Sequence, residues 1–498
     1  MRFIRCLPIL VVLFGPSVHA GETTSAPVRE SWDAAYLEGQ KAGSRHTTIA
    51  EFTREGQALR RVTRELTLTV RRGATTSTLN IVEGDEETLD GKVVGVFAEY
   101  NRGRELSISG RLDSGVMRTT VRPAGRDSFS NNVRWNDEII SLTAEESLFK
   151  ERQVKPGDRI SYRIYSPTIA NIANTEVSVK DWENVPVAGK ARRLLRLEAN
   201  QGKVNGNQLP ITTLWLDEQL NVVQSRSVQP ALGELTLVRG TRAQANQPVE
   251  RIPDLFAVQA IPLNKPIPRR AQETSVTYRV TLNSPLDDIE KLFAVGDGRQ
   301  ETANVKPSSL ELRVTAKNAP DKEVREGDAG EEFTKSNYLI NSDDALVRKY
   351  ARSAVGRETD DWRKAQQITL WVKGNMRPLK FDNGINPADE AAKSLEGDCT
   401  EFAMLAAAMC RAEGVPSRTA IGLAYKDDFG KPKLNYHMWL EVFVKGQWIA
   451  LDPTLGLNAV GAAHLKITDH SWAGTRSMLP LLPVMRFMTA KPKIEVIN

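Results

Sequence analysis

The sequence predicts a multidomain protein in which a large antiparallel β-rich N-terminal region is followed by a C-terminal α+β domain. The chain has 498 residues, which exceeds the size at which a single hydrophobic core stops growing. Apolar and polar residues alternate with period two from about Trp32 to Gly240, as in strands with one buried and one solvated face. From Ser342 onward, apolar residues recur with the spacing of an amphipathic α-helix.

The first twenty residues predict a secretory signal peptide. Arg2 and Arg5 precede an apolar run at residues 7–14, and residues 18–20 resemble a small-residue cleavage site. The run is too short for a permanent membrane anchor, and no other stretch approaches eighteen apolar residues. We therefore expect a soluble protein that is exported to the periplasm or outside the cell and has no transmembrane segment.

Charge and cysteine content narrow the possible functions. Removing Arg2 and Arg5 with the signal peptide lowers the formal net charge from +5 to about +3, which is too little to indicate a nucleic-acid partner. The mature chain keeps Cys399 and Cys410, eleven positions apart. On one helix they would be separated by about 16 Å, whereas a disulfide requires Cα atoms within about 7 Å. We expect two free thiols, with Cys410 in a packing role.

Changes in composition predict the domain boundaries. After the signal peptide at residues 1–20, residues 21–245 form the β-rich N-terminal domain, which contains no cluster of His, Cys or carboxylates with metal-ligand spacing. Five prolines within residues 246–270 predict a semi-rigid linker. Residues 271–334 predict a small β-rich segment, residues 335–475 the C-terminal domain, and residues 476–498 a C-terminal tail.

The stretch from Gly397 to Glu401 predicts a helix that begins at Cys399. Asp398 can act as the N-cap, and Glu401 three positions later completes a capping box, while Gly414 marks the end. The backbone N–H groups and macrodipole at a helix start favour a thiolate, whereas the charges of Asp398 and Glu401 oppose it. A single cysteine is more often a small buried hydrophobe, so its reactivity depends on partners elsewhere.

A predicted β-hairpin supplies such partners. Residues 436–444 and 447–452 are strongly β-forming and are joined by a Lys-Gly turn at residues 445–446. A two-residue turn sets a register in which His437 and Asp452 share one face as diagonal neighbours, about 7–8 Å apart at the backbone. Each residue alone is more often structural. Together with a helix-initial cysteine, they provide the nucleophile, base and orienting carboxylate of acyl transfer.

Four motifs surround these three residues in order: Gly397-Asp398-Cys399-Thr400-Glu401-Phe402, Gly414-Val415-Pro416-Ser417-Arg418, His437-Met438-Trp439-Leu440-Glu441-Val442 and Trp448-Ile449-Ala450-Leu451-Asp452-Pro453-Thr454-Leu455-Gly456. They resemble the bacterial branch of the transglutaminase-like superfamily over roughly residues 343–469. The resemblance implies a papain-like α+β fold with Cys399 as nucleophile, His437 as base and Asp452 as the residue that orients the base. It also implies that no metal or organic cofactor takes part.

The predicted function is cysteine-dependent acyl transfer on peptide or other amide bonds through a thioester, most simply hydrolysis by a peptidase-like or amidase-like enzyme. The expected partner is a protein, peptide or other amide substrate. A close alternative is a protein cross-linking transglutaminase, in which a primary amine rather than water resolves the thioester. An alternative of another class is a catalytically inactive, β-rich binding or scaffold protein.

The surroundings of the predicted triad are less well defined by sequence. The backbone N–H of the cysteine is the expected first oxyanion donor. Trp362, Trp371 and Trp439 each offer an indole N–H as a second donor, although each is more simply a core residue. His464 and Lys466 follow the Asp452 region and could border the cleft, but we expect them on a surface loop.

Overall fold

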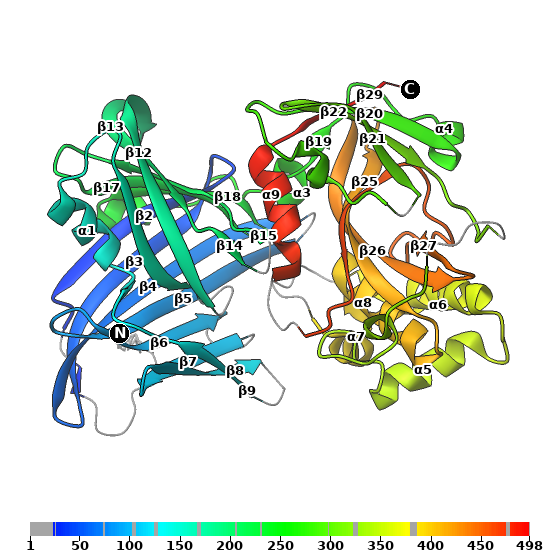
Figure 1. Ribbon diagram of the computed structural model, residues 1–498, viewed down its shortest axis with the longest axis horizontal. Helices are drawn as coiled ribbons and strands as arrows, with labels where there is room; N and C mark the ends of the chain where they lie inside the picture. The colour runs from blue at the N-terminus through cyan, green and yellow to red at the C-terminus, as the bar shows by residue number, and fades with distance from the viewer. Residues whose placement is uncertain are drawn as a thin grey trace, which may run out of the picture.

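The computed structural model describes residues 23–24, 26–72, 75–101, 106–123, 128–166, 171–204, 207–229, 232–296, 298–321, 327–378, 386–474 and 479–497. The predicted signal peptide at residues 1–20 lies outside the described residues. Two bodies lie side by side in Figure 1, a β-rich N-terminal body and a mixed C-terminal body. Helix α9 (Leu482–Ala490) lies between them.

The N-terminal body is a strongly curved, mostly antiparallel sheet (Figure 1). In the described residues it has 16 strands, in the order β10-β11-β12-β13-β16-β17-β18-β2-β3-β4-β5-β6-β7-β8-β9 with β1 paired to β3. The strands are β1 (Thr23–Thr24), β2 (Arg29–Leu37), β3 (Gln40–Arg54), β4 (Gln57–Arg72), β5 (Thr75–Thr88), β6 (Val93–Tyr100), β7 (Leu106–Asp113), β8 (Val116–Pro123), β9 (Phe129–Arg134), β10 (Ile139–Ile140), β11 (Arg159–Ser166), β12 (Asn171–Val187), β13 (Lys190–Asn200), β16 (Thr212–Leu216), β17 (Val222–Gln229) and β18 (Gly233–Gly240). A separate ribbon pairs β14 (Lys203–Val204) with β15 (Asn207–Gln208).

Alternating apolar side chains give this sheet a buried face. Helix α1 (Ala144–Arg152) places Phe149 against that face, in a cluster with Val177, Leu197 and Leu214 from three strands. Burying apolar area of this kind is the main favourable term that offsets the entropy of ordering so many strands. The predicted fold class, a large antiparallel β-rich N-terminal region before an α+β C-terminal domain, is confirmed.

The proline-containing stretch after β18 differs from the predicted linker. After α2 (Arg242–Ala245), residues 246–270 contain α3 (Leu255–Val258), β19 (Ile261–Pro262) and the start of α4 (Arg269–Glu273). Leu255 joins the apolar core of the N-terminal sheet, whereas Ile261 pairs with Leu434 of the C-terminal body. Residues 246–270 are therefore docked on both bodies, because apolar residues between the prolines pack into a core on either side.

The C-terminal body combines two sheets with helices around one hydrophobic core. One sheet has the order β19-β26-β25-β28 with β27 on β26, and the other the order β21-β22-β20-β29. Their strands are β20 (Ser275–Thr281), β21 (Gln300–Lys306), β22 (Ser309–Thr315), β25 (Ser417–Asp427), β26 (Pro432–Val444), β27 (Gln447–Leu451), β28 (His464–His470) and β29 (Lys493–Val496), and β23 (Arg377–Pro378) pairs with β24 (Glu396–Gly397). The helices are α4 (Arg269–Glu273), α5 (Ala345–Val355), α6 (Asp361–Asn375), α7 (Ala388–Ser394) and α8 (Cys399–Ala412), with short 3-10 turns η2 (Ile289–Leu292), η3 (Glu331–Phe333) and η4 (Leu479–Leu481).

Two predicted segments belong to this common core rather than standing apart. Tyr278 of β20 and Leu312 of β22, from the small β-rich segment, are buried in the same cluster as helix α8. The predicted tail at 476–498 contains α9 and β29, and β29 completes the second sheet by pairing with β20. The helix expected to start at Ser342 is capped instead by Asp344, whose side chain accepts the N–H of Leu346 at 2.8 Å.

None of the helices in the described part of the chain combines the length and the apolarity needed to cross a membrane.

Candidate active site

Helix α8 holds Cys399 at its first residue. The Asp398 side chain accepts the Thr400 N–H at 2.8 Å, and the Glu401 side chain accepts the Asp398 N–H at 2.9 Å, which completes the predicted capping box. Gly397 is required before it, because a Cβ at this position would lie 2.3 Å from the Cβ of Glu401. Burial and the neighbouring Asp398 raise the pKa of Glu401 to about 8, so at neutral pH this residue adds little negative charge near the sulfur.

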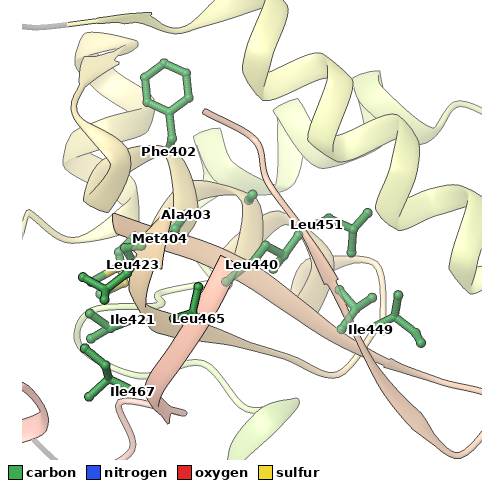
Figure 2. Close-up of a cluster of buried hydrophobic side chains, with 14 of the residues drawn as sticks. Phe402, Ala403, Met404, Ile421, Leu423, Leu440, Ile449, Leu451, Leu465 and Ile467 are labelled. Atoms are coloured by element: carbon green, nitrogen blue, oxygen red, sulfur yellow. The ribbon is translucent and has the colours of Figure 1, made fainter. Parts of the chain in front are cut away.

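The apolar body of α8 anchors this helix start against the sheet. Figure 2 shows the side chains of the sheet strands gathered beside α8, among them Leu423, Leu440 and Leu465. Cys410 near the other end of α8 is fully buried, whereas Cys399 is only partly buried, and both thiols are free. The two cysteines therefore occupy different environments on one helix.

The hairpin of β26 and β27 has the register expected from a two-residue turn. Val444 pairs with Gln447 and Leu440 pairs with Leu451. Lys445 and Gly446 have φ values of 52° and 82°, the left-handed conformation that such a turn requires. This register brings His437 beside Asp452, with 2.7 Å between Nε2 and Oδ2.

Both oxygens of Asp452 are fully engaged. Oδ1 accepts the backbone N–H groups of Thr454 and Leu455 at 2.9 and 3.0 Å. Oδ2 lies 2.7 Å from Nε2 of His437 and 3.1 Å from Nε2 of His464. Burial alone would raise the pKa of Asp452, but the two histidines outweigh it and hold that pKa well below its ordinary value. Asp452 is therefore a buried, oriented carboxylate.

His437 also interacts with the side chain of Cys399. The structure therefore brings the three predicted site residues together. Burial would lower the pKa of His437, but Asp452 and then Cys399 raise it to about 10. A cationic imidazole beside a sulfur is the pairing found at reactive cysteines.

The pKa of His437 predicts how stability depends on pH. An ordinary histidine titrates near pH 6.5, whereas this pKa is raised to about 10 in the folded protein. The contribution of this proton to stability is therefore complete below about pH 6.5 and is lost as the pH rises towards about 10. Denaturant unfolding across this window should show the free energy of unfolding falling, and His437→Gln should flatten the fall. An unchanged slope in His437→Gln would contradict this assignment.

The expectation of a surface loop at His464 and Lys466 is wrong. Both residues lie on strand β28, which pairs with β25 through Ala424 and Gly422, and both are buried. Leu465 and Ile467 alternate with them and join the apolar core (Figure 2). That period-two alternation was the available sequence signal for a strand, but a pairing with β25 could not be read from it.

Lys466 belongs to a buried network of four charges on β25, β26 and β28. Its Nζ lies 3.0 Å from Oε1 of Glu441 and 3.2 Å from Oδ2 of Asp469. Arg418 contacts the same two carboxylates at 2.8 and 2.9 Å. Two cations and two carboxylates thus compensate one another, so the network supports the sheet and supplies no unpaired group for catalysis.

The tryptophans considered as second oxyanion donors have structural environments. Trp439 is fully buried with its ring centroid 6.3 Å from that of His437 and 5.4 Å from that of His464. Its indole N–H has no hydrogen-bond partner among the described residues, but a side chain closed to solvent cannot contact a substrate. Trp362 and Trp371 pack against the core of the C-terminal body.

His437, Asp452 and His464 also present three potential metal ligands within 4.8 Å of one another. Both Nε2 atoms, however, face the same carboxylate oxygen at 2.7 and 3.1 Å, which are hydrogen-bond lengths. A metal ion bound by these three residues would have to displace the hydrogens that the two Nε2 atoms donate to Asp452. The arrangement fits a carboxylate shared by two imidazoles better than it fits a cation centre.

Residues 348–453 match the family model of the Transglutaminase-like superfamily. A stretch of 108 residues, 21% of this chain, is 27% identical to an uncharacterised protein of Haemophilus influenzae and spans 29% of that protein. A candidate cysteine protease from Cytophaga hutchinsonii shares 18% identity over 40% of this chain and 78% of its own, with a TM-score of 0.26. A β-barrel-like protein of the domain of unknown function DUF1849 from Brucella abortus shares 11% identity over 43% of this chain and 95% of its own, with a TM-score of 0.28.

The matched residues include Cys399, His437 and Asp452, whereas His464 follows the matched stretch. The match begins within α5 and ends directly after β27, so it covers helix α8 together with the β26–β27 hairpin. The predicted resemblance is thereby confirmed for this part of the chain. Residues 348–453 of the C-terminal body form a transglutaminase-like domain.

Proposed function

We propose that this protein is an exported, cysteine-dependent hydrolase that cleaves a peptide or another amide through a thioester. The observation that carries the proposal is the juxtaposition of three side chains: His437 is hydrogen-bonded to Asp452 and interacts with the thiol of Cys399. A partly buried sulfur at a helix start, next to a cationic imidazole, meets the requirements of a thiolate nucleophile. The export step relies on the signal peptide predicted at residues 1–20.

The reaction divides into two steps. The sulfur of Cys399 forms a bond to the amide carbonyl carbon, the C–N bond breaks, and the imidazolium of His437 gives its proton to the leaving amine. Water then adds to the thioester while His437 takes one of its protons. The C–S bond breaks, the carboxylic acid leaves, and the thiolate is restored. Throughout, Asp452 orients the ring and stabilises its cationic form.

Helix α8 also supplies electrostatic support for the oxyanion. The first N–H groups of a helix have no partner within the helix, and the positive end of the macrodipole lies at the same place. The N–H of Cys399 is the nearest such donor to the carbon that the sulfur attacks. An oxyanion forming there would be stabilised in a partly buried site, where a hydrogen bond is stronger than in water.

The fate of the thioester distinguishes hydrolysis from cross-linking. We expect incubation with a glutamine-containing peptide and a dansylated primary amine to yield free acid and ammonia without a dansylated product. Mass spectrometry of the same preparation should give a mature chain that starts at Gly21. Cys399→Ala, purified in parallel, should form neither product.

Other products would change the assignment. A dansylated amide that requires Cys399 would make the protein a cross-linking transferase rather than a hydrolase. Slow alkylation of Cys399 by iodoacetamide, with no product from a broad panel of peptides and amides, would instead favour an inactive β-rich binding protein.

A further inference from the structure

We propose that His464 is a positioning residue of this site, acting on Asp452 as Asp452 acts on His437. The proposal rests on the proposed cysteine chemistry and adds a second histidine to it. His464 lies beyond the stretch that matches the transglutaminase-like family, on a strand that the three predicted site residues do not occupy. Its side chain is buried and its Nε2 is 3.1 Å from Oδ2 of Asp452.

One oxygen of Asp452 is shared by two imidazoles. Oδ2 of Asp452 accepts from His437 at 2.7 Å and from His464 at 3.1 Å. In a site from which water is excluded, removing one of these donors leaves a charged oxygen with an unsatisfied position. His464 therefore supplies a second hydrogen bond to this oxygen, as a bound water would in a solvent-exposed site.

The charge state of His464 suits this role. Burial lowers its pKa, and the attraction of Asp452 only partly offsets that effect, with His437 and Arg299 as the cationic groups that also face it. A neutral imidazole can donate one N–H without adding a second positive charge beside His437. The carboxylate thus keeps its ion pair with His437 and gains a fixed direction.

The protein holds the His464 ring and backbone rigidly. The ring meets Trp439 edge to face at 5.4 Å between centroids and 85° between planes. Arg299 donates to the carbonyl oxygens of Gly461 at 2.6 Å and His464 at 2.8 Å. The side chain of Gln300 donates to the carbonyl oxygen of Lys466 at 2.9 Å and accepts the backbone N–H of Lys466 at 2.6 Å.

Arg299 and Gln300 are themselves buried and come from the β-rich segment before the transglutaminase-like domain. That segment therefore contributes to the site, because its two side chains hydrogen-bond to the backbone of the strand that carries His464. His464 is hydrogen-bonded to Asp452, and Asp452 is hydrogen-bonded to His437. The segment is therefore linked to the imidazole of the proposed site. The same segment also shares one hydrophobic core with helix α8.

Two substitutions of similar volume separate positioning from packing. His464→Gln carries an amide N–H that can take the place of Nε2, whereas His464→Leu fills the space without a donor. The readout is the second-order rate of Cys399 alkylation by iodoacetamide at pH 6, with the labelled residue identified by mass spectrometry. Thermal unfolding of each variant verifies that it is folded.

We expect His464→Leu to slow alkylation about tenfold, because a hydrogen bond to a charged group changes an equilibrium by about that factor or more. His464→Gln should stay within about threefold of the wild type. Equal rates in all three proteins, or an equal slowing in both variants, would overturn the positioning role. Dialysis against EDTA should leave the wild-type rate unchanged, and a rate that falls and is restored by Zn²⁺ would make His464 a metal ligand instead.

The wild type distinguishes this proposal from the one on which it rests. If wild-type Cys399 reacts no faster than Cys399 in His437→Ala, the proposed cysteine chemistry fails and the role of His464 fails with it. If the wild type reacts fast, depends on His437 and is indifferent to His464→Leu, only the positioning role is lost.

Discussion

Replacing Cys399 with alanine is expected to lower the rate of amide hydrolysis by about 10³- to 10⁶-fold, the range seen when a nucleophile is removed from a site whose members act as a unit. In the proposed mechanism the sulfur is the only atom of the site that forms a covalent bond to the substrate, and the helix N–H groups that remain would offer electrostatic support alone. His437→Ala should cost a similar factor, and Asp452→Asn less, because the carboxylate acts through the ring. Release of free acid from the glutamine-containing peptide measures all three.

Cys410→Ala is the matched control on the same helix. Cys410 is fully buried, and burial raises the pKa of its thiol, so it is present as an inert, neutral group at physiological pH. Its replacement should leave turnover nearly unchanged and lower stability by about 1 kcal/mol through lost packing. An active Cys399→Ala protein together with an inactive Cys410→Ala protein would show that the wrong thiol has been assigned.

Glu441→Ala is expected to destabilise the protein by about 3–5 kcal/mol, the cost of breaking a buried ion pair by removing one partner. Glu441 is only 1% exposed and contacts both Lys466 and Arg418. Removing its carboxylate leaves two buried cations that share the single charge of Asp469. Denaturant unfolding followed by circular dichroism measures the loss.

Two further variants test the cause of that loss. Replacing Glu441 and Lys466 together with methionine removes one cation with the anion and leaves the Arg418 contact to Asp469, so most of the stability should return. Asp343→Ala breaks an exposed pair with Arg348 and should leave the free energy of unfolding nearly unchanged. A Glu441→Ala protein as stable as Asp343→Ala would contradict the buried network.

Contacts that depend on near neighbours were predictable from the sequence. The helix begins at Cys399 because Asp398 and Glu401 lie within three positions of each other and cap it in both directions. The hairpin register follows from residues 445–446, since a two-residue turn determines every pair behind it. These two local rules, with the order of the motifs, were enough to anticipate the transglutaminase-like domain.

Contacts between distant segments were not predictable in the same way. The alternation around His464 allowed a strand, but the choice between a surface loop and a buried position depended on its pairing with β25. Likewise, no local signal required the C-terminal β29 to pair with β20. Each pairing depends on which apolar faces remain uncovered after the rest of the chain has packed.

The sequence by itself thus determined the local elements that carry the predicted nucleophile, base and carboxylate, because each of these residues lies in a motif with its own capping or turn rule. Only the tertiary structure decided that Asp452 is shared by the imidazoles of His437 and His464. It alone also decided that Arg299 and Gln300 hydrogen-bond to the backbone of the strand that carries His464. The physical reason is that capping and turn formation are short-range, whereas strand pairing and the satisfaction of buried polar groups depend on the whole packed fold.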